Sequence, residues 1–435
     1  LAAAAVCLIY NSTPVNPGPV GVPLITAASV VSDAVTNLGG DSSKFAHLLT
    51  VWTCIPHMIG GVFIIMTGVF VLTKVFGKNH SFKDAIPAIP FCLLTAFVLG
   101  LLYIPLSIFG TTELVSMLSF IISLPTLIFC AKKGILMPKE TWNFAGYEKW
   151  EDKSTHSSSV ISSVKEKEMK PMLAWLPYII IGLLLVMTRL NLAGLKTLFT
   201  NDHCIIHVEN ILGFKDINWD FKILYNPGFF PFLPVALLTI LMHKMTKEEA
   251  KLAITDSFKQ IKGAAIALFF GVAMVNIYRY TSNANIGISM DITRAATEYT
   301  FKNSSMLYAM ARALADLFKN TYFLIAPLIG VLGAFMSGSC TVSNTLFASL
   351  QFETATLVGL SQVFIVALQS MGGAIGNMIC VNNIVSVCAT TGTNGNEGKI
   401  IRTNIGPCLM YACIVAIIVG VLLGIGVNPM PELLK

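Results

Sequence analysis

The stretch that decides the fold runs Gly333-Ala-Phe-Met-Ser-Gly-Ser-Cys-Thr-Val-Ser-Asn-Thr-Leu-Phe347, a hydrophobic segment with hydrogen-bonding side chains at its centre. Five of these side chains fall within seven residues, namely Ser339, Thr341, Ser343, Asn344 and Thr345. Close helix packing requires small residues, but it does not require so many hydrogen-bonding groups. Irregular backbone inside a bilayer leaves amide and carbonyl groups that protein, water or substrate must satisfy. The stretch therefore predicts a cavity inside a membrane protein.

Two further hydrophobic stretches are interrupted in the same way, so that the broken segments are 11–31, 338–351 and 372–392. The first contains Asn11-Ser-Thr-Pro-Val-Asn-Pro-Gly-Pro, which is too rich in proline for a continuous helix. The third begins Gly372-Gly-Ala-Ile-Gly-Asn, although its glycines would equally suit close helix packing. Asn-Ser-Thr in the first break and Ser-Asn-Thr in the second form a matched pair, and matched breaks in two halves point to a transporter's binding site. We therefore predict an inverted-repeat secondary transporter with broken helices or re-entrant hairpins.

The composition of the chain agrees with a membrane location. Of 435 residues, 54% are apolar and only 12% are charged, which is about half the charged fraction of soluble domains. Each membrane span needs roughly 20 mostly apolar residues. About nine stretches meet this need: 48–73, 85–108, 112–131, 173–190, 228–243, 263–280, 321–337, 356–371 and 405–427. We expect an all-α polytopic protein that crosses the lipid bilayer of the plasma membrane several times.

The distribution of charge divides the chain into parts. These are an N-terminal transmembrane part with the first break (1–131), a cytoplasmic polar loop (132–172), a central transmembrane part (173–280) and a C-terminal transmembrane part with the other two breaks (281–435). The basic segment 243–262 is expected to form a separate interfacial helix. The topology after Tyr280 stays open. Residues 1–10 look like the second half of a helix, so we expect further sequence upstream.

Several classes of function are not supported by the sequence. The net charge of +6 is carried by lysines in short connections rather than on a basic domain, which argues against a nucleic-acid partner. The ten cysteines occur singly, without the spacing of metal ligands. Neither a zinc-protease motif nor a nucleophile elbow is present. We therefore expect no enzyme activity, no bound metal and no cofactor.

The polar groups of the breaks suit a small organic carboxylate. Helix N-termini direct free N–H groups and the positive end of the helix dipole at an anion, and Asn, Ser and Thr side chains can bond a hydroxyl group. The three broken segments contain no Lys or Arg. Because an uncompensated charge at the bilayer centre is costly, we expect a co-transported cation, either a proton or, as the alternative, sodium.

Four ionisable residues are candidates for further roles. Glu353 and His57 are candidates for proton coupling, because an ionisable group near a membrane cavity suggests function. Alternatively, Glu353 faces solvent, and His57 bonds a carbonyl group that Pro56 frees. Arg189 and Arg279 lie near the ends of predicted spans, where they would attract substrate anions or would only anchor the helix at the interface.

The motifs at the breaks resemble the L-lactate permease family, secondary transporters of lactate, glycolate and related 2-hydroxy monocarboxylates that are generally proton-coupled. The resemblance is carried by Asn11-Ser-Thr-Pro-Val, by Ser337-Gly-Ser-Cys-Thr-Val-Ser-Asn-Thr-Leu-Phe and by Leu368-Gln-Ser-Met-Gly-Gly-Ala-Ile-Gly-Asn-Met-Ile-Cys-Val-Asn-Asn-Ile. With the residue chemistry, it implies a substrate site formed by Asn11, Ser12, Thr13, Ser339, Thr341, Ser343, Asn344, Thr345, Gln369, Gly376, Asn377, Asn382 and Asn383. For Gln369 the alternative is a bridge between helices.

Two positions depart from the family pattern. Cys340 stands where these proteins commonly have Asn, which removes an amide from the expected site, and Asn16-Pro-Gly-Pro replaces a more apolar stretch. The resemblance implies a permease that imports L-lactate and related monocarboxylates by proton symport with alternating access. A sodium-coupled carrier of di- or monocarboxylates is the alternative. A passive channel is a further one, which accumulation of substrate against a gradient would exclude.

Overall fold

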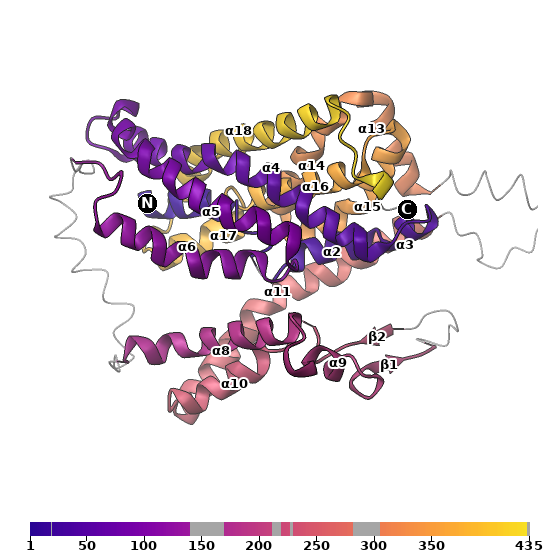
Figure 1. The fold of residues 1–435 in the computed structure, drawn as a ribbon, viewed down its shortest axis with the longest axis horizontal. Coiled ribbons are helices and arrows are strands. Elements are labelled where there is room, and N and C mark those ends of the chain that lie inside the picture. Colours follow the sequence, from indigo (N-terminus) through magenta and orange to yellow (C-terminus); the bar gives the residue numbers. More distant parts are fainter. Residues whose placement is uncertain (19, 140–168, 211–218, 227–228, 282–304, 433–435) are drawn as a thin grey trace, which may run out of the picture.

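The computed structural model describes residues 1–18, 20–139, 169–210, 219–226, 229–281 and 305–432, which form a bundle of helices (Figure 1). In these ranges, seven helical stretches are long and apolar enough to cross a membrane: Ser42–Phe76, Phe82–Phe109, Val115–Lys132, Met172–Arg189, Met306–Ser337, Gln362–Thr390 and Glu397–Gly424. Their surfaces expose large apolar side chains such as Phe97 and Phe129, as a lipid-facing surface requires. The chain is an all-α polytopic integral membrane protein, as predicted.

The N-terminal part surrounds the first break. Its elements are α1 (Ala2–Asn11), α2 (Val22–Val30), α3 (Ser32–Asn37), α4 (Ser42–Val71), η1 (Leu72–Phe76), η2 (Phe82–Ala88), α5 (Ile89–Phe109) and α6 (Val115–Lys132). The carboxylate of Asp41 caps α4 by accepting from the backbone N–H groups of Ser43 and Lys44. Helix α4 packs against both α5 and α2. This long span therefore contacts the helix that follows the first break.

The central part lies along one side of the bundle in Figure 1, and its last helix, α11, runs between the rest of this part and the bundle. Its elements are α8 (Pro171–Arg189), η5 (Leu192–Gly194), α9 (Leu195–Phe199), η6 (Asp202–Cys204), the antiparallel strands β1 (Ile206–Val208) and β2 (Trp219–Phe221), α10 (Phe232–Met242) and α11 (Lys247–Tyr280). The helix expected over 243–262 and the span expected over 263–280 form one helix, which Thr246 caps and which continues to Tyr280. The interfacial location of its first part stays a prediction. Helix α10 is also shorter than the span expected over 228–243.

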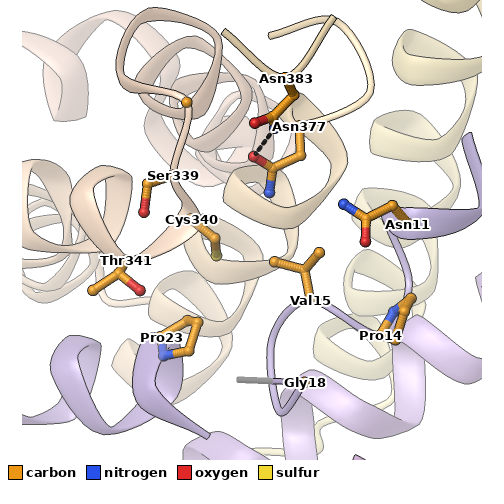
Figure 2. A pocket seen from close by; sticks show the side chains of 11 residues that line it. Asn11, Pro14, Val15, Gly18, Pro23, Ser339, Cys340, Thr341, Asn377 and Asn383 are labelled. Atoms are coloured by element: carbon orange, nitrogen blue, oxygen red, sulfur yellow. Dashed lines mark hydrogen bonds between the residues drawn. The ribbon is translucent and has the colours of Figure 1, made fainter. Parts of the chain in front are cut away.

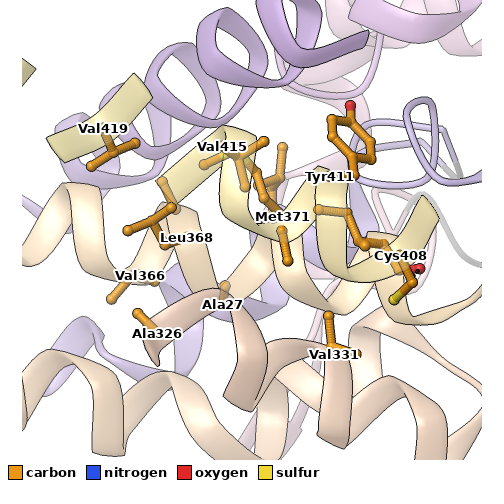
Figure 3. Close-up of a cluster of buried hydrophobic side chains, with 14 of the residues drawn as sticks. Ala27, Ala326, Val331, Val366, Leu368, Met371, Cys408, Tyr411, Val415 and Val419 are labelled. Atoms are coloured by element: carbon orange, nitrogen blue, oxygen red, sulfur yellow. Dashed lines mark hydrogen bonds between the residues drawn. The ribbon is translucent and has the colours of Figure 1, made fainter. Parts of the chain in front are cut away.

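The C-terminal part supplies the core of the bundle. Its elements are α13 (Met306–Phe318), η8 (Lys319–Thr321), α14 (Tyr322–Ser337), α15 (Cys340–Val358), α16 (Gln362–Gly376), α17 (Val381–Thr390), α18 (Glu397–Gly424) and η9 (Met430–Glu432). Every residue of α16 after Gln362 is buried. In Figure 3, Leu368 and Met371 of α16 lie against Val415 of α18 within one buried cluster. Helix α16 is therefore the central element, with α14, α15, α18 and α4 packed around it.

The boundaries of α15 and α16 differ from the span expected over 356–371. Gly359 adopts a φ of 78°, a left-handed conformation that suits glycine and ends α15, and α16 begins only at Gln362. The expected span therefore combined the end of one helix with the start of the next. The internal repeat, the four-part division and the membrane sidedness stay predictions, and most of the polar loop lies outside the described residues.

Helices α14 and α16 approach each other closely through glycine. A methyl group at Gly372 would clash with the backbone carbonyl of Pro327, and one at Gly376 would clash with the carbonyl of Val331. On the facing helix, a methyl group at Gly330 would meet the backbone of α16. Gly372 and Gly376 therefore allow close helix packing, which was the alternative considered for the glycines of the third motif.

Candidate functional site

A cavity of about 360 Å³ lies where the three breaks meet (Figure 2). It is lined by Asn11, Pro14, Val15, Gly18 and Pro23 at the first break, by residues 338–341 at the second, and by Asn377 and Asn383 at the third. Segments that lie at opposite ends of the sequence therefore face one space. These are the segments that the sequence singled out by their polar composition.

The first break follows from proline and glycine. Asn11 ends α1, and residues 12–18 and 20–21 form turns instead of helix. Gly21, with a φ of 69°, precedes α2, and Pro23 sits in the first turn of that helix, where its missing N–H is not needed. A side chain at Gly21 would also crowd Thr112. This geometry turns the chain inside the bundle and places Asn11, Pro14, Val15, Gly18 and Pro23 at the cavity.

The second break is much shorter than predicted. Gly338, with a φ of 78°, ends α14, and the hydroxyl of Ser339 caps α15 by accepting from the N–H of Val342. Residues 340–351, which were expected to continue the break, are helical. Thr345 is compatible with the helix because its hydroxyl donates to the carbonyl of Thr341 one turn earlier.

Three helix N-termini border the cavity. The lining residues Pro23, Thr341 and Asn383 belong to the first turns of α2, α15 and α17. First-turn N–H groups have no acceptor within their own helix, and the dipole adds partial positive charge there. Among the described residues, no Lys or Arg lines this cavity. This arrangement of backbone dipoles suits an anion without a fixed cation.

Five of the thirteen residues predicted for the site line this cavity: Asn11, Ser339, Thr341, Asn377 and Asn383. Figure 2 shows the amides of Asn377 and Asn383 side by side, and Asn383 Nδ2 donates to Asn377 Oδ1 over 3.1 Å. This bond orients the Asn377 amide at the edge of the cavity. Asn382, exposed on α17, lies against Gly338 instead.

Other predicted residues form the wall behind the cavity. Gln369 Nε2 donates to Ser343 Oγ over 3.0 Å, and Gln369 Oε1 accepts from Gln351. Asn344 Nδ2 donates to the carbonyl of Pro23 over 2.9 Å. These side chains are buried and join α2, α15 and α16, as in the helix-bridging alternative for Gln369. Their hydrogen bonds hold the helices behind the cavity together, and this role does not require contact with substrate.

Asn16 and Ser370 were not singled out for the site, yet both lie in its wall. Ser370 Oγ donates to Asn16 Oδ1 over 2.9 Å and accepts from Asn344 Nδ2 over 2.9 Å. Asn16 also accepts from the thiol of Cys340, which lines the cavity. Asn16 and Cys340 are more than 300 residues apart in the sequence. The sequence feature that could have indicated Asn16 was the expected departure of Asn16-Pro-Gly-Pro from the family pattern.

The predicted residues Ser12, Thr13 and His57 form a second polar group. His57 Nε2 lies 3.1 Å from the carbonyl oxygen of Ser12, so the acceptor is at the first break and is not a carbonyl freed by Pro56. His57 Nδ1 lies 3.1 Å from the hydroxyl of Tyr411, which is also 3.2 Å from Thr13 Oγ1. The first break is thus bonded to α4 and α18 through one buried histidine and one tyrosine.

Glu353 and Arg189 are not among the residues that line the cavity. Glu353 is half-buried on α15, fourteen residues beyond Ser339 and therefore about 20 Å along the helix axis. Arg189 is buried at the end of α8, 3.4 Å from the carboxylate of Glu113 and stacked over Tyr225. Its charge is already paired. Arg279 lies in the last turn of α11, and its side chain lies outside the described residues.

The membrane fold and a polar cavity between interrupted helices define a multi-pass membrane transporter. The family model for L-lactate permease matches residues 1–426, so the chain belongs to the L-lactate permease family and is a permease, not an enzyme. It is 24% identical over 442 residues to an L-lactate permease of Escherichia coli K12 and 26% identical over 438 residues to one of Bacillus subtilis 168; each match covers 96% of this chain and 70% of the relative.

A shorter match is to a glycolate permease. The glycolate permease of Escherichia coli K12 is 40% identical over 93 residues, which are 21% of this chain and 17% of that protein. The chain thus spans between 17% and 70% of the length of these three relatives. No solved structure matches it.

Proposed function

We propose that this protein imports L-lactate and related small 2-hydroxy monocarboxylates across the plasma membrane by proton symport with alternating access. The observation that carries the proposal is the cavity at which three helix N-termini and five polar side chains converge. The N-termini suit a carboxylate. The Asn377–Asn383 amide pair and the Ser339 hydroxyl suit the adjacent 2-hydroxyl group, because each can donate or accept.

The names of the relatives support the same substrate class. Two are L-lactate permeases and one is a glycolate permease, and lactate and glycolate share a carboxylate next to a hydroxyl-bearing carbon. A cavity of about 360 Å³ is ample for such a molecule, since pockets from roughly 300 Å³ hold much larger ligands. Because no described lining residue is cationic, a co-transported ion has to balance the negative charge of the substrate.

The bonding of His57 favours a proton as that ion. Because a carbonyl oxygen only accepts, the Nε2 atom facing Ser12 carries the hydrogen, which leaves Nδ1 able to take up a proton. The Tyr411 hydroxyl can then accept from Nδ1 while it donates to the backbone carbonyl of His57, 3.0 Å away. When His57 is neutral, the single hydroxyl hydrogen of Tyr411 can bond only one of the two acceptors, Nδ1 or the carbonyl, so protonation of Nδ1 completes both bonds. A charged His57 would also be bonded through Nε2 to Ser12 of the first break.

Uptake into proteoliposomes tests the proposal against the sodium-coupled alternative. Labelled lactate and glycolate should accumulate when the interior is alkaline, and a sodium gradient alone should have no effect. Unlabelled glycolate should compete with lactate, whereas succinate should not. Accumulation that requires sodium, or competition by succinate, would overturn the proposal in favour of a sodium-coupled di- or monocarboxylate carrier.

A further inference from the structure

A second cavity, of about 460 Å³, lies between α1, α4, α5 and α6. Its walls are apolar, with Met58, Ile64, Phe91, Leu99, Phe120 and Leu127 among the lining residues. Within the part of the chain that the structure describes, no Lys, Arg, Asp or Glu lines it. Pro14 lines both this cavity and the polar one, and Thr13 lines this one alone. The first break therefore separates an anion-attracting space from an apolar one.

Two hydroxyl groups in this apolar wall lack a partner. The hydroxyl oxygens of Tyr103 on α5 and Ser123 on α6 are buried, and neither has a hydrogen-bond partner among the described residues. The side chains are only 5% and 1% exposed. An unpaired buried hydroxyl is unfavourable, so a bound molecule with a hydrogen-bonding group would be stabilised here. An apolar wall with a few polar groups is typical of a ligand site.

The bilayer supplies the route into this cavity. Phe120 and Leu124 line the cavity, yet they are 56% and 39% exposed on α6. Their neighbours Ile121 and Ile128 are exposed as well, so this face of a spanning helix contacts lipid. A molecule dissolved among the lipid tails can therefore reach the cavity without crossing water.

We propose that this second cavity binds an uncharged amphiphile from the membrane, with an alkyl body and one hydroxyl or protonated carboxyl group. The alkyl body contacts the apolar wall, and the head group bonds Tyr103 and Ser123. A charged head group is disfavoured, because no lining side chain would pair with it. Thr13 and Pro14 belong to the wall, so an occupant restrains the first break. It therefore inhibits transport without competing with lactate. This consequence rests on the proposed function.

Photolabelling with a diazirine-bearing octanol tests the binding site without measuring transport. In proteoliposomes, mass spectrometry should find adducts in residues 91–103 and 120–127, and excess octanol should suppress them. Leu99→Trp fills the cavity and should lower labelling by about an order of magnitude, whereas Leu101→Trp, at a position 60% exposed on the same helix and outside the cavity wall, should not. Tyr103→Phe with Ser123→Ala should weaken the competition by octanol roughly fivefold.

Each arm has an outcome that contradicts the proposal. Labelling spread over the exposed faces of α5 and α6 and unchanged by Leu99→Trp would show only contact with bulk lipid. Labelling confined to the cavity but accompanied by unchanged lactate uptake would overturn the inhibitory role. If the protein fails to transport lactate at all, the labelling pattern still decides whether the cavity binds the amphiphile. Monodisperse elution of each variant in detergent confirms that it is folded.

Discussion

The thiol of Cys340 donates a hydrogen bond to Asn16 Oδ1 over 3.2 Å, across the wall of the polar cavity. Cys340 and the stretch Asn16-Pro-Gly-Pro are the two places at which the sequence was expected to depart from the family pattern. Cys340 removes an amide from the second break, and Asn16 brings an amide to the same place from the first. Asn16 Nδ2 is buried without a partner among the described residues. The pair therefore places the Asn16 amide directly behind Cys340, which lines the cavity.

A double-mutant cycle tests this pairing. Cys340→Ala and Asn16→Ala each remove one partner, and contacting residues show interaction energies of about 0.5–3 kcal/mol. We expect a coupling in this range in the apparent affinity for lactate, measured as the concentration dependence of uptake. Asn79→Ala, in an exposed connection where Asn79 bonds Asp84, should be additive with Cys340→Ala. Additivity of Cys340→Ala with Asn16→Ala would contradict the pairing.

Asn377→Ala tests the proposed contact with substrate. The substitution removes the amide at the edge of the cavity and the partner of Asn383. Loss of a hydrogen bond to the neutral 2-hydroxyl group amounts to about 0.5–1.5 kcal/mol, so the KM for lactate should rise by roughly two- to tenfold. The amount of protein in the membrane should not change. Unchanged uptake at low lactate concentration would remove Asn377 from the site.

The location of the breaks could be predicted from the sequence, because proline, glycine and clustered amides are local signals. The extent of the second break could not. Ser343, Asn344 and Thr345 were interpreted as part of an irregular segment, but they are helical, and their polar groups bond a carbonyl of α14, the start of α2 or the preceding turn. Those partners are set by tertiary contacts, which composition does not reveal.

Gly372→Ala tests the close packing of α16 against α14. The added methyl group would clash with the backbone carbonyl of Pro327, and overpacking a core costs about 1–3 kcal/mol. We expect a lower Tm in detergent. Gly100→Ala in α5 is the matched control, because a methyl group there meets no described atom within 4 Å. An equal Tm for wild type and Gly372→Ala would show that α14 and α16 do not approach this closely.

Substitution of Arg189 distinguishes a structural role of this residue from attraction of the substrate anion. Its side chain is only 3% exposed and faces Glu113, and removing one partner of a buried ion pair costs about 3–5 kcal/mol. Arg189→Met should therefore lower the Tm, and Arg189→Met with Glu113→Leu should recover part of the loss. The KM for lactate should stay unchanged in the double variant. An increased KM there would support the anion-attracting role first considered for this residue.

The environment of His57 shows a second limit of sequence reasoning. An isolated histidine in an apolar span indicated either a proton relay or a bonded carbonyl, and the nearest proline suggested which carbonyl. Instead, Ser12 and Tyr411, from the first break and from the last long helix, supply its partners. Partners so distant in sequence follow only from the packing of α1, α4 and α18.

The central claim is that lactate enters through the polar cavity together with a proton. The most direct measurement is the external pH of lightly buffered, de-energised proteoliposomes when lactate is added. The account predicts alkalinisation of the medium with wild-type protein and a much smaller change with His57→Gln. Entry of labelled lactate through the wild-type protein without any change in external pH would contradict it.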